Sequence, residues 1–139
     1  DKKQPRDPRA YLRDMRAMTL LIIDDHESFL NAAAGMIRQL AGIKSVHQAV
    51  GGRRGLELAA ALKPDCVLVD FAMPEVDGIA VTRGLKTGPN PPKVVVMSLH
   101  ADPEYRDMAL AAGADAFIPK TELHTGLVPL LTRLGQVTG

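Results

Sequence analysis

Five residues with charged or hydroxyl side chains stand at or just beyond the ends of short apolar runs: Asp24, Asp25, Asp70, Ser98 and Lys120. If those runs are parallel strands, all five side chains lie along one edge of a single sheet. Carboxylates held close together repel one another, which costs stability unless a cation or protons offset the charge. Ligand sets made only of oxygen favour a hard ion such as Mg²⁺, which often also binds phosphate oxygens. The pattern therefore favours phosphoryl chemistry over the plain alternative of separately solvated loop acids.

The rest of the sequence predicts the elements that would hold these residues. Five short runs of aliphatic and β-branched residues suit buried strands: 19–23, 45–50, 66–69, 94–97 and 116–118. Apolar residues at helical spacing predict the helices between and after them: 28–41, 53–62, 79–85, 103–112 and 127–134. Alternating strands and helices are typical of an α/β fold, here a five-stranded parallel sheet, doubly wound with helices on both faces.

The last of these helices contains a proline. Pro129 would remove a backbone hydrogen bond and clash with the preceding turn unless it lay close to the helix start. We therefore expect this helix to start late, with Thr125 as its cap, and to be short or kinked. Such a helix is a poor basis for a dimer.

The length and the charge of the chain indicate one folded domain with an extension. The chain has 139 residues, and its 17 Lys and Arg against 16 Asp and Glu lack the basic excess of most nucleic-acid-binding domains. Residues 1–17 carry a net charge of +3, and residues 18–139 carry −2. We therefore separate a basic N-terminal extension, 1–17, from a domain, 18–139. A short helix is expected at 8–16, in either a native docking segment or a linker or vector remnant.

Other residue types exclude several classes of site. The single cysteine, Cys66, excludes an internal disulfide and a multi-cysteine metal site, and it suits a small core position. The four histidines lie in different segments without ligand spacing, which argues against zinc. No apolar run approaches the roughly 18 residues that span a membrane, and no signal-peptide pattern is found. We expect a cytoplasmic protein without membrane contact.

Five motifs in order resemble the receiver domains of two-component response regulators. They are Leu-Ile-Ile-Asp-Asp-His-Glu at 21–27, Pro-Asp-Cys-Val-Leu-Val-Asp at 64–70, Met-Pro-Glu-Val-Asp-Gly at 73–78, Val-Met-Ser at 96–98 and Ala-Gly-Ala-Asp-Ala-Phe-Ile-Pro-Lys at 112–120. The resemblance covers nearly all of residues 19–134 and implies the flavodoxin-like receiver fold. Asp-Asp-His-Glu at 24–27 and Ser-Leu-His at 98–100 look most like receivers joined to a LuxR-type helix-turn-helix. That likeness implies a role in transcriptional regulation.

The resemblance assigns roles to the residues at the predicted strand ends. It implies that the carboxylate of Asp70 is the phosphoacceptor, which takes a phosphoryl group from a phosphohistidine of a sensor histidine kinase. Lys120 and Mg²⁺ would neutralise the charge on the transferring group, and the hydroxyl of Ser98 would donate to one of its oxygens. Three carboxylates and one backbone carbonyl would hold Mg²⁺: Asp24, Asp25, Asp70 and Ala72.

The resemblance also implies roles for three further positions, in the conformational switch and in the lifetime of the aspartyl phosphate. Phe117 matches the aromatic that fills the space left when Ser98 moves inward; the alternative is a plain core phenylalanine. Ala72 and His100 match two variable positions that tune hydrolysis of the aspartyl phosphate in this family, and His100 is otherwise a solvated loop histidine. The switching face would combine the predicted helices and strand of the C-terminal third: 103–112, 116–118 and 127–134.

The expected partners are a sensor histidine kinase and a second copy of the chain, with DNA reached only through an output domain absent from this chain. The chemistry would be self-catalysed transfer and slow autodephosphorylation without enzymatic turnover. A Mg²⁺-dependent phosphatase with an aspartyl nucleophile would need an acid where Ala72 stands. The remaining alternative is a receiver-like scaffold that binds partners without phosphorylation.

Overall fold

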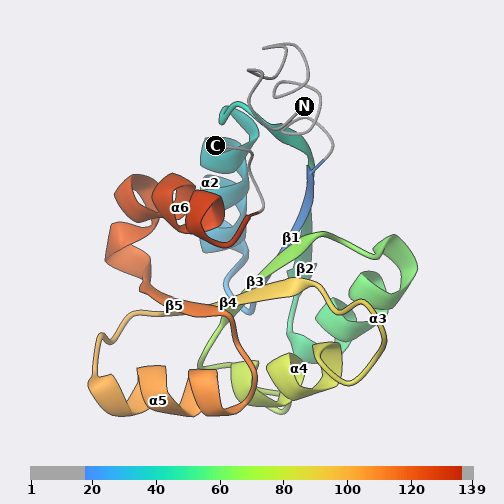
Figure 1. Cartoon of the computed structure of the whole chain (residues 1–139), viewed down its shortest axis with the longest axis vertical. Helices are drawn as coiled ribbons and strands as arrows, with labels where there is room; N and C mark the ends of the chain where they lie inside the picture. Colours follow the sequence, from blue (N-terminus) through green and yellow to red (C-terminus); the bar gives the residue numbers. More distant parts are fainter. Residues whose placement is uncertain (1–17, 136–139) are drawn as a thin grey trace, which may run out of the picture.

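The computed structural model describes residues 18–135, and Figure 1 shows the order of their strands and helices. The strands are β1 (Met18–Asp24), β2 (Ile43–Val50), β3 (Cys66–Asp70), β4 (Lys93–Ser98) and β5 (Ala116–Pro119). The helices are α2 (Glu27–Arg38), α3 (Gly52–Leu62), α4 (Gly78–Leu85), α5 (Pro103–Ala111) and α6 (Leu123–Arg133), with a 3₁₀ turn η1 (Lys120–Glu122). Every predicted element of this region is present. The helix predicted at 8–16 lies outside the described residues.

The five strands form one parallel sheet in the order β2-β1-β3-β4-β5. Helices α2 and α6 cover one face of this sheet, and α3, α4 and α5 cover the other (Figure 1). This arrangement confirms the doubly wound, flavodoxin-like fold predicted from the sequence. None of the described helices combines the length and the apolar character that crossing a membrane requires.

Side chains of alternate residues in the central strands pack into two hydrophobic cores, one on each face of the sheet. In β1, Leu20 and Ile22 join the core under α2 and α6, whereas Leu21 and Ile23 join the opposite core; all four are fully buried. Burial of each such side chain contributes about 1.5–3 kcal/mol. Cys66 of β3 is buried in the first core, as predicted, and burial raises the pKa of its thiol to about 12.

The strand register brings several polar strand ends to one edge of the sheet. Asp70 at the end of β3 pairs with Met97, the residue before Ser98 at the end of β4. Asp24 ends the neighbouring strand β1. A slip by one residue would turn every side chain of a strand to the opposite face, so the two buried cores fix this register.

The last helix differs from its prediction. It begins at Leu123 instead of residue 127, so Thr125 lies inside the helix and does not cap it. Pro129 lies within the helix on its exposed side. The buried face consists of four leucines: Leu123, Leu127, Leu130 and Leu131. Because these leucines pack against the core, their burial outweighs the single hydrogen bond that the proline removes.

Candidate functional site

Four side chains with ligand atoms gather at the carboxyl edge of the sheet: Asp24, Asp25, His26 and Asp70. One ligand atom from each lies within 4.8 Å of the others. Asp24 is fully buried at the end of β1, and Asp70 keeps only 5% of its surface exposed at the end of β3. The sheet thus brings together the three acids that the sequence singled out.

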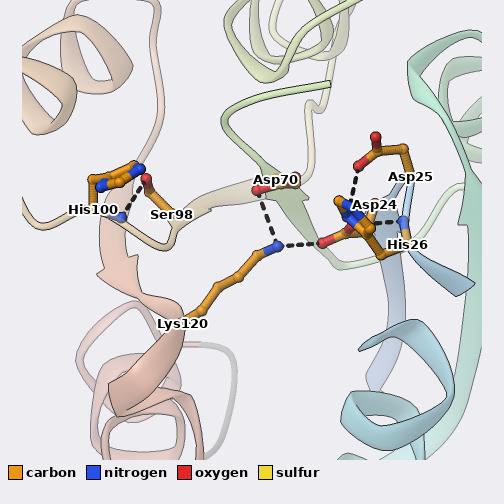
Figure 2. Close-up of polar contacts among 7 residues, drawn as sticks. All are labelled: Asp24, Asp25, His26, Asp70, Ser98, His100 and Lys120. Carbon is orange, nitrogen blue, oxygen red and sulfur yellow. Dashed lines mark hydrogen bonds and ion pairs between the residues drawn. The ribbon is translucent and has the colours of Figure 1, made fainter. Parts of the chain in front are cut away.

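Lys120 is the cation of this site. From η1, directly after β5, its side chain extends between two strand ends, as Figure 2 shows. Its Nζ lies 2.7 Å from Oδ2 of Asp24 and 3.2 Å from Oδ1 of Asp70. The lysine side chain is almost completely buried, so water screens these ion pairs weakly. One ammonium therefore serves two buried carboxylates, and the site keeps an excess of negative charge.

The pKa of Asp70 reflects this imbalance. Burial raises it above the usual 3.8, the charge of Asp24 raises it further, and Asp25 adds a smaller contribution of the same sign. The ammonium of Lys120 lowers the pKa of Asp70 by charge and hydrogen bonding without cancelling those effects. Asp70 is therefore a carboxylate whose negative charge is only partly compensated.

His26 joins the acid cluster from the residue preceding α2. Its backbone N–H donates to Oδ1 of Asp24 at 2.9 Å. Its ring Nδ1 lies 3.0 Å from Oδ1 of Asp25, an ion-pair contact drawn in Figure 2. The same nitrogen lies 3.3 Å from Oδ1 of Asp24, and only this second contact has hydrogen-bond geometry. Oδ1 of Asp25 is therefore buried without a hydrogen bond from any described residue.

The donor set fits Mg²⁺. A buried carboxylate oxygen without a hydrogen bond costs free energy, and a hard cation is its natural partner. Asp24 and Asp70 place further carboxylate oxygens within 4.8 Å of the ligand atom of Asp25. The imidazole of His26 is a softer ligand that Mg²⁺ prefers less than oxygen. The three carboxylates are the residues that would hold the ion.

Ser98 stands across the site from the acid cluster. It is buried at the end of β4, and its Oγ accepts a hydrogen bond from the backbone N–H of His100 at 3.0 Å. The hydroxyl proton of Ser98 has no acceptor among the described residues, so it remains free for an incoming oxygen. The His100 side chain is exposed, with its ring 6.1 Å from that of Tyr105.

Phe117 and Ala72 are the two remaining positions to which the sequence assigns a role near the site. Phe117 is half-buried in β5 and packs on the core under α3, α4 and α5. Ala72 is exposed in the loop after β3, two residues beyond Asp70. The metal-binding role of its carbonyl and the switching role of Phe117 both stay predictions.

The loop after β3 folds tightly against the strand end. The N–H of Gly78 donates to the carbonyl of Phe71 at 3.0 Å. A Cβ at Gly78 would collide with the backbone oxygen of Asp70, so only glycine permits this approach. Asp77 then starts α4, because its side chain accepts a hydrogen bond from the N–H of Ala80 at 2.9 Å.

Two residues of this site were not assigned to it from the sequence. His26 belongs to the motif at 21–27, but the sequence interpretation gives it no role in the site, although its place directly after Asp24 and Asp25 is a usable signal. The ring of Phe29 lies under Lys120, with 4.3 Å between the ring centroid and Nζ. No local pattern signals that contact, because the two residues meet only when α2 and β5 pack on the same sheet.

The doubly wound sheet and the lysine-bridged acids at its carboxyl edge are the features expected of a receiver domain. The sequence profile of the family described as response regulator receiver domain matches residues 20–131. This chain belongs to that family, the receivers of two-component signalling.

Individual relatives agree with this assignment. The protein-glutamate methylesterase/protein-glutamine glutaminase of Alkalilimnicola ehrlichii is 37% identical over 101 residues, which cover 72% of this chain and 26% of the relative. The response regulator GacA of Pseudomonas aeruginosa is 32% identical over 118 residues, which cover 85% of this chain and 54% of the relative. The signal receiver domain of a NarL response regulator from Mycobacterium tuberculosis matches with a TM-score of 0.73 and 28% identity, covering 81% of this chain and 94% of that chain.

The matches cover different fractions of each relative's own length. The chain spans about a quarter of the methylesterase and about half of GacA, but nearly all of the NarL receiver structure.

Proposed function

We propose that Asp70 accepts a phosphoryl group from a phosphohistidine of a sensor histidine kinase in a Mg²⁺-dependent reaction, and that the modification changes the affinity of this domain for a partner. The observation that supports this most is the placement of Asp70 itself. Its Oδ1 lies 3.2 Å from the ammonium of Lys120, and Asp70 lies in the cluster whose ligand atoms, those of Asp24 and Asp25 included, are within 4.8 Å of one another.

The proposed transfer makes one bond and breaks one. An oxygen of Asp70 attacks phosphorus, the bond between phosphorus and the imidazole nitrogen of the donor breaks, and that nitrogen keeps the electron pair. Lys120 stabilises charge on the phosphoryl oxygens, and Ser98 donates its free hydroxyl proton to one of them. Asp24 and Asp25, with Asp70, would hold Mg²⁺, which supplies further charge neutralisation when bound.

The surface that changes on phosphorylation and contacts the partner is proposed to lie on α5, β5 and α6. Large apolar side chains are exposed on these helices and on the loop before α5: Leu99, Met108, Leu110 and Val128. An exposed apolar group of this kind suits a surface that another molecule covers. Phe117 of β5 is the proposed aromatic of the switch, and the covering molecule is a second copy of the chain or the output domain of a transcriptional regulator.

Intact mass spectrometry tests the acceptor role. The protein is incubated with Mg²⁺ and acetyl phosphate, beside an Asp70→Asn variant and a sample with chelator. We expect a gain of one phosphoryl group that is absent in the variant and in the chelated sample. No gain by the folded wild-type protein would contradict the proposal and favour the scaffold that binds partners without phosphorylation. Light scattering on the same samples shows whether the modification changes the oligomeric state.

A further inference from the structure

Phe29 of α2 contacts the cation of the site. The centroid of its ring lies 4.3 Å from Nζ of Lys120, which is the same nitrogen that pairs with Asp24 and Asp70. Phe29 itself is half-buried against the core under α2 and α6. The ammonium is thus enclosed by two carboxylates and one aromatic face.

The position of Phe29 is fixed by the acid cluster and by β2. The backbone N–H of His26 donates to Oδ1 of Asp24 at 2.9 Å, and the carbonyl of His26 accepts from the N–H of Leu30 at 3.1 Å. The side chain of Gln48 on β2 donates to the carbonyl of Leu30 at 2.8 Å. The first turn of α2 is therefore held from both sides, and Phe29 lies on that turn.

The chemistry of an aromatic face suits a lysine that must exchange partners. A ring attracts an ammonium through its quadrupole, most strongly where water is excluded, and it takes up no directional hydrogen bond. Lys120 can then turn its N–H groups from the carboxylates toward a phosphoryl oxygen while its nitrogen keeps its place. A flexible lysine without the ring would have several arrangements around the two acids and would lose entropy in choosing one.

We propose that Phe29 is a positioning residue for Lys120, which holds the ammonium for phosphoryl transfer to Asp70. This inference rests on the proposed phosphoacceptor function. It predicts that the electronic character of the ring matters in addition to its volume.

The test compares four proteins in the acetyl phosphate reaction at saturating Mg²⁺: wild type, Phe29→Leu, Phe29→Tyr and a form with pentafluorophenylalanine at position 29. We expect the initial rate to fall about three- to tenfold for the leucine and pentafluorophenylalanine forms, since both lose the attraction. The tyrosine form should stay close to the wild-type rate. Met36→Ala in the same helix is the matched control, because Met36 packs on the same core.

Nuclear magnetic resonance gives a second readout that needs no phosphorylation. The ε-CH₂ protons of Lys120 should resonate upfield in the wild type because of the ring, and at ordinary positions in Phe29→Leu. An ordinary wild-type shift, or a pentafluorophenylalanine form with the wild-type rate, would overturn the role of Phe29. A wild-type protein that takes up no phosphoryl group would instead overturn the proposed function. The role of Phe29 in phosphoryl transfer to Asp70 would then be overturned as well.

Discussion

At the residue scale, the central feature is one ammonium shared by two buried acids. Lys120 lies within 3.2 Å of both Asp24 and Asp70, and Asp25 adds a third negative charge nearby. This arrangement is costly for the free domain, because like charges stay close with incomplete compensation. The same excess of charge favours a divalent cation and gives the phosphoryl group a prepared site. Stability and function therefore make opposite demands on these residues.

The first prediction concerns that cost. Asp70→Asn should raise the free energy of unfolding of the chelator-treated protein by on the order of 1 kcal/mol at pH 7, because the amide removes the repulsion with Asp24. In wild type the raised pKa of Asp70 means that its protonated form favours folding. That contribution to stability is complete below pH 3.8, the ordinary pKa of the carboxyl group. It is lost as the pH rises through the higher pKa that Asp70 has in the folded protein.

The advantage of Asp70→Asn over wild type should therefore grow as the pH rises through this window. Urea unfolding of both proteins at a series of pH values measures it. A difference that does not change with pH, or a variant that is less stable at pH 7, would show that Asp70 is not under this repulsion.

The second prediction concerns Lys120. Lys120→Met keeps a long apolar stem and removes the charge, so phosphorylation by acetyl phosphate should slow by about 100-fold. The time course of intact mass gives the rate. Lys44→Met, at an exposed position of β2, serves as the control for loss of a lysine and should react like wild type. If both variants reacted equally fast, Lys120 would have no part in the transfer.

At the element scale, the site depends on how closely the loop after β3 returns to the strand. Gly78 begins α4 where a side chain would strike the backbone of Asp70, so the helix start and the acceptor are linked by one contact. Gly35 in the interior of α2 differs, because a Cβ there would meet open space.

These two glycines make a matched pair for the third prediction. Gly35→Ala should raise the free energy of unfolding by about 0.5–1 kcal/mol, the usual gain in a helix interior. Gly78→Ala should lower it by about 2 kcal/mol or more and slow phosphorylation, because the backbone must shift beside Asp70. Urea unfolding and the acetyl phosphate assay measure both effects. Equal stabilisation by the two changes would show that the loop has room at Gly78.

The elements differ in how well their sequence predicts them. The strands were predicted because both faces of the sheet are buried, which leaves short continuous apolar runs such as 66–69. Helix α6 starts earlier than its sequence predicts. The penalty of Pro129 is local, whereas the leucines of that helix gain from packing on a core assembled by distant segments. The acids and Lys120 are predicted together from their positions after strands, although Lys120 lies 96 positions from Asp24. The contact between Lys120 and Phe29 can be learned only from the packing.

At the scale of the whole molecule, the site and the proposed output face share the loop after β4. Ser98 accepts a hydrogen bond from the N–H of His100, and the His100 ring lies 6.1 Å from Tyr105 on α5. The Tyr105 ring is also 4.7 Å from Phe71, the residue after Asp70. These contacts link Ser98 and the residue after Asp70 to α5, and we expect a change at the site to reach α5 through them.

The fourth prediction follows from this path. If Ser98 turns to the phosphoryl group, the N–H of His100 loses its acceptor and should exchange with solvent faster, together with the first turn of α5. Hydrogen exchange with acetyl phosphate in excess measures this. Peptides from the C-terminal half of α3 serve as the internal control, because α3 packs on β1 and β2, away from β5 in the strand order. Unchanged exchange across 98–106 in fully phosphorylated protein would contradict this route to the output face.

If the proposed function is right, a phosphoryl group becomes bonded to the carboxylate of Asp70. Borohydride added to the phosphorylated protein reduces an aspartyl phosphate to homoserine and releases phosphate, and peptide sequencing by mass spectrometry then locates the change. We expect homoserine at position 70 alone, and none when Mg²⁺ is chelated. Phosphorylated protein in which Asp70 remains aspartate after reduction, with the phosphoryl group on Ser98 or homoserine at another acid, would contradict Asp70 as the acceptor.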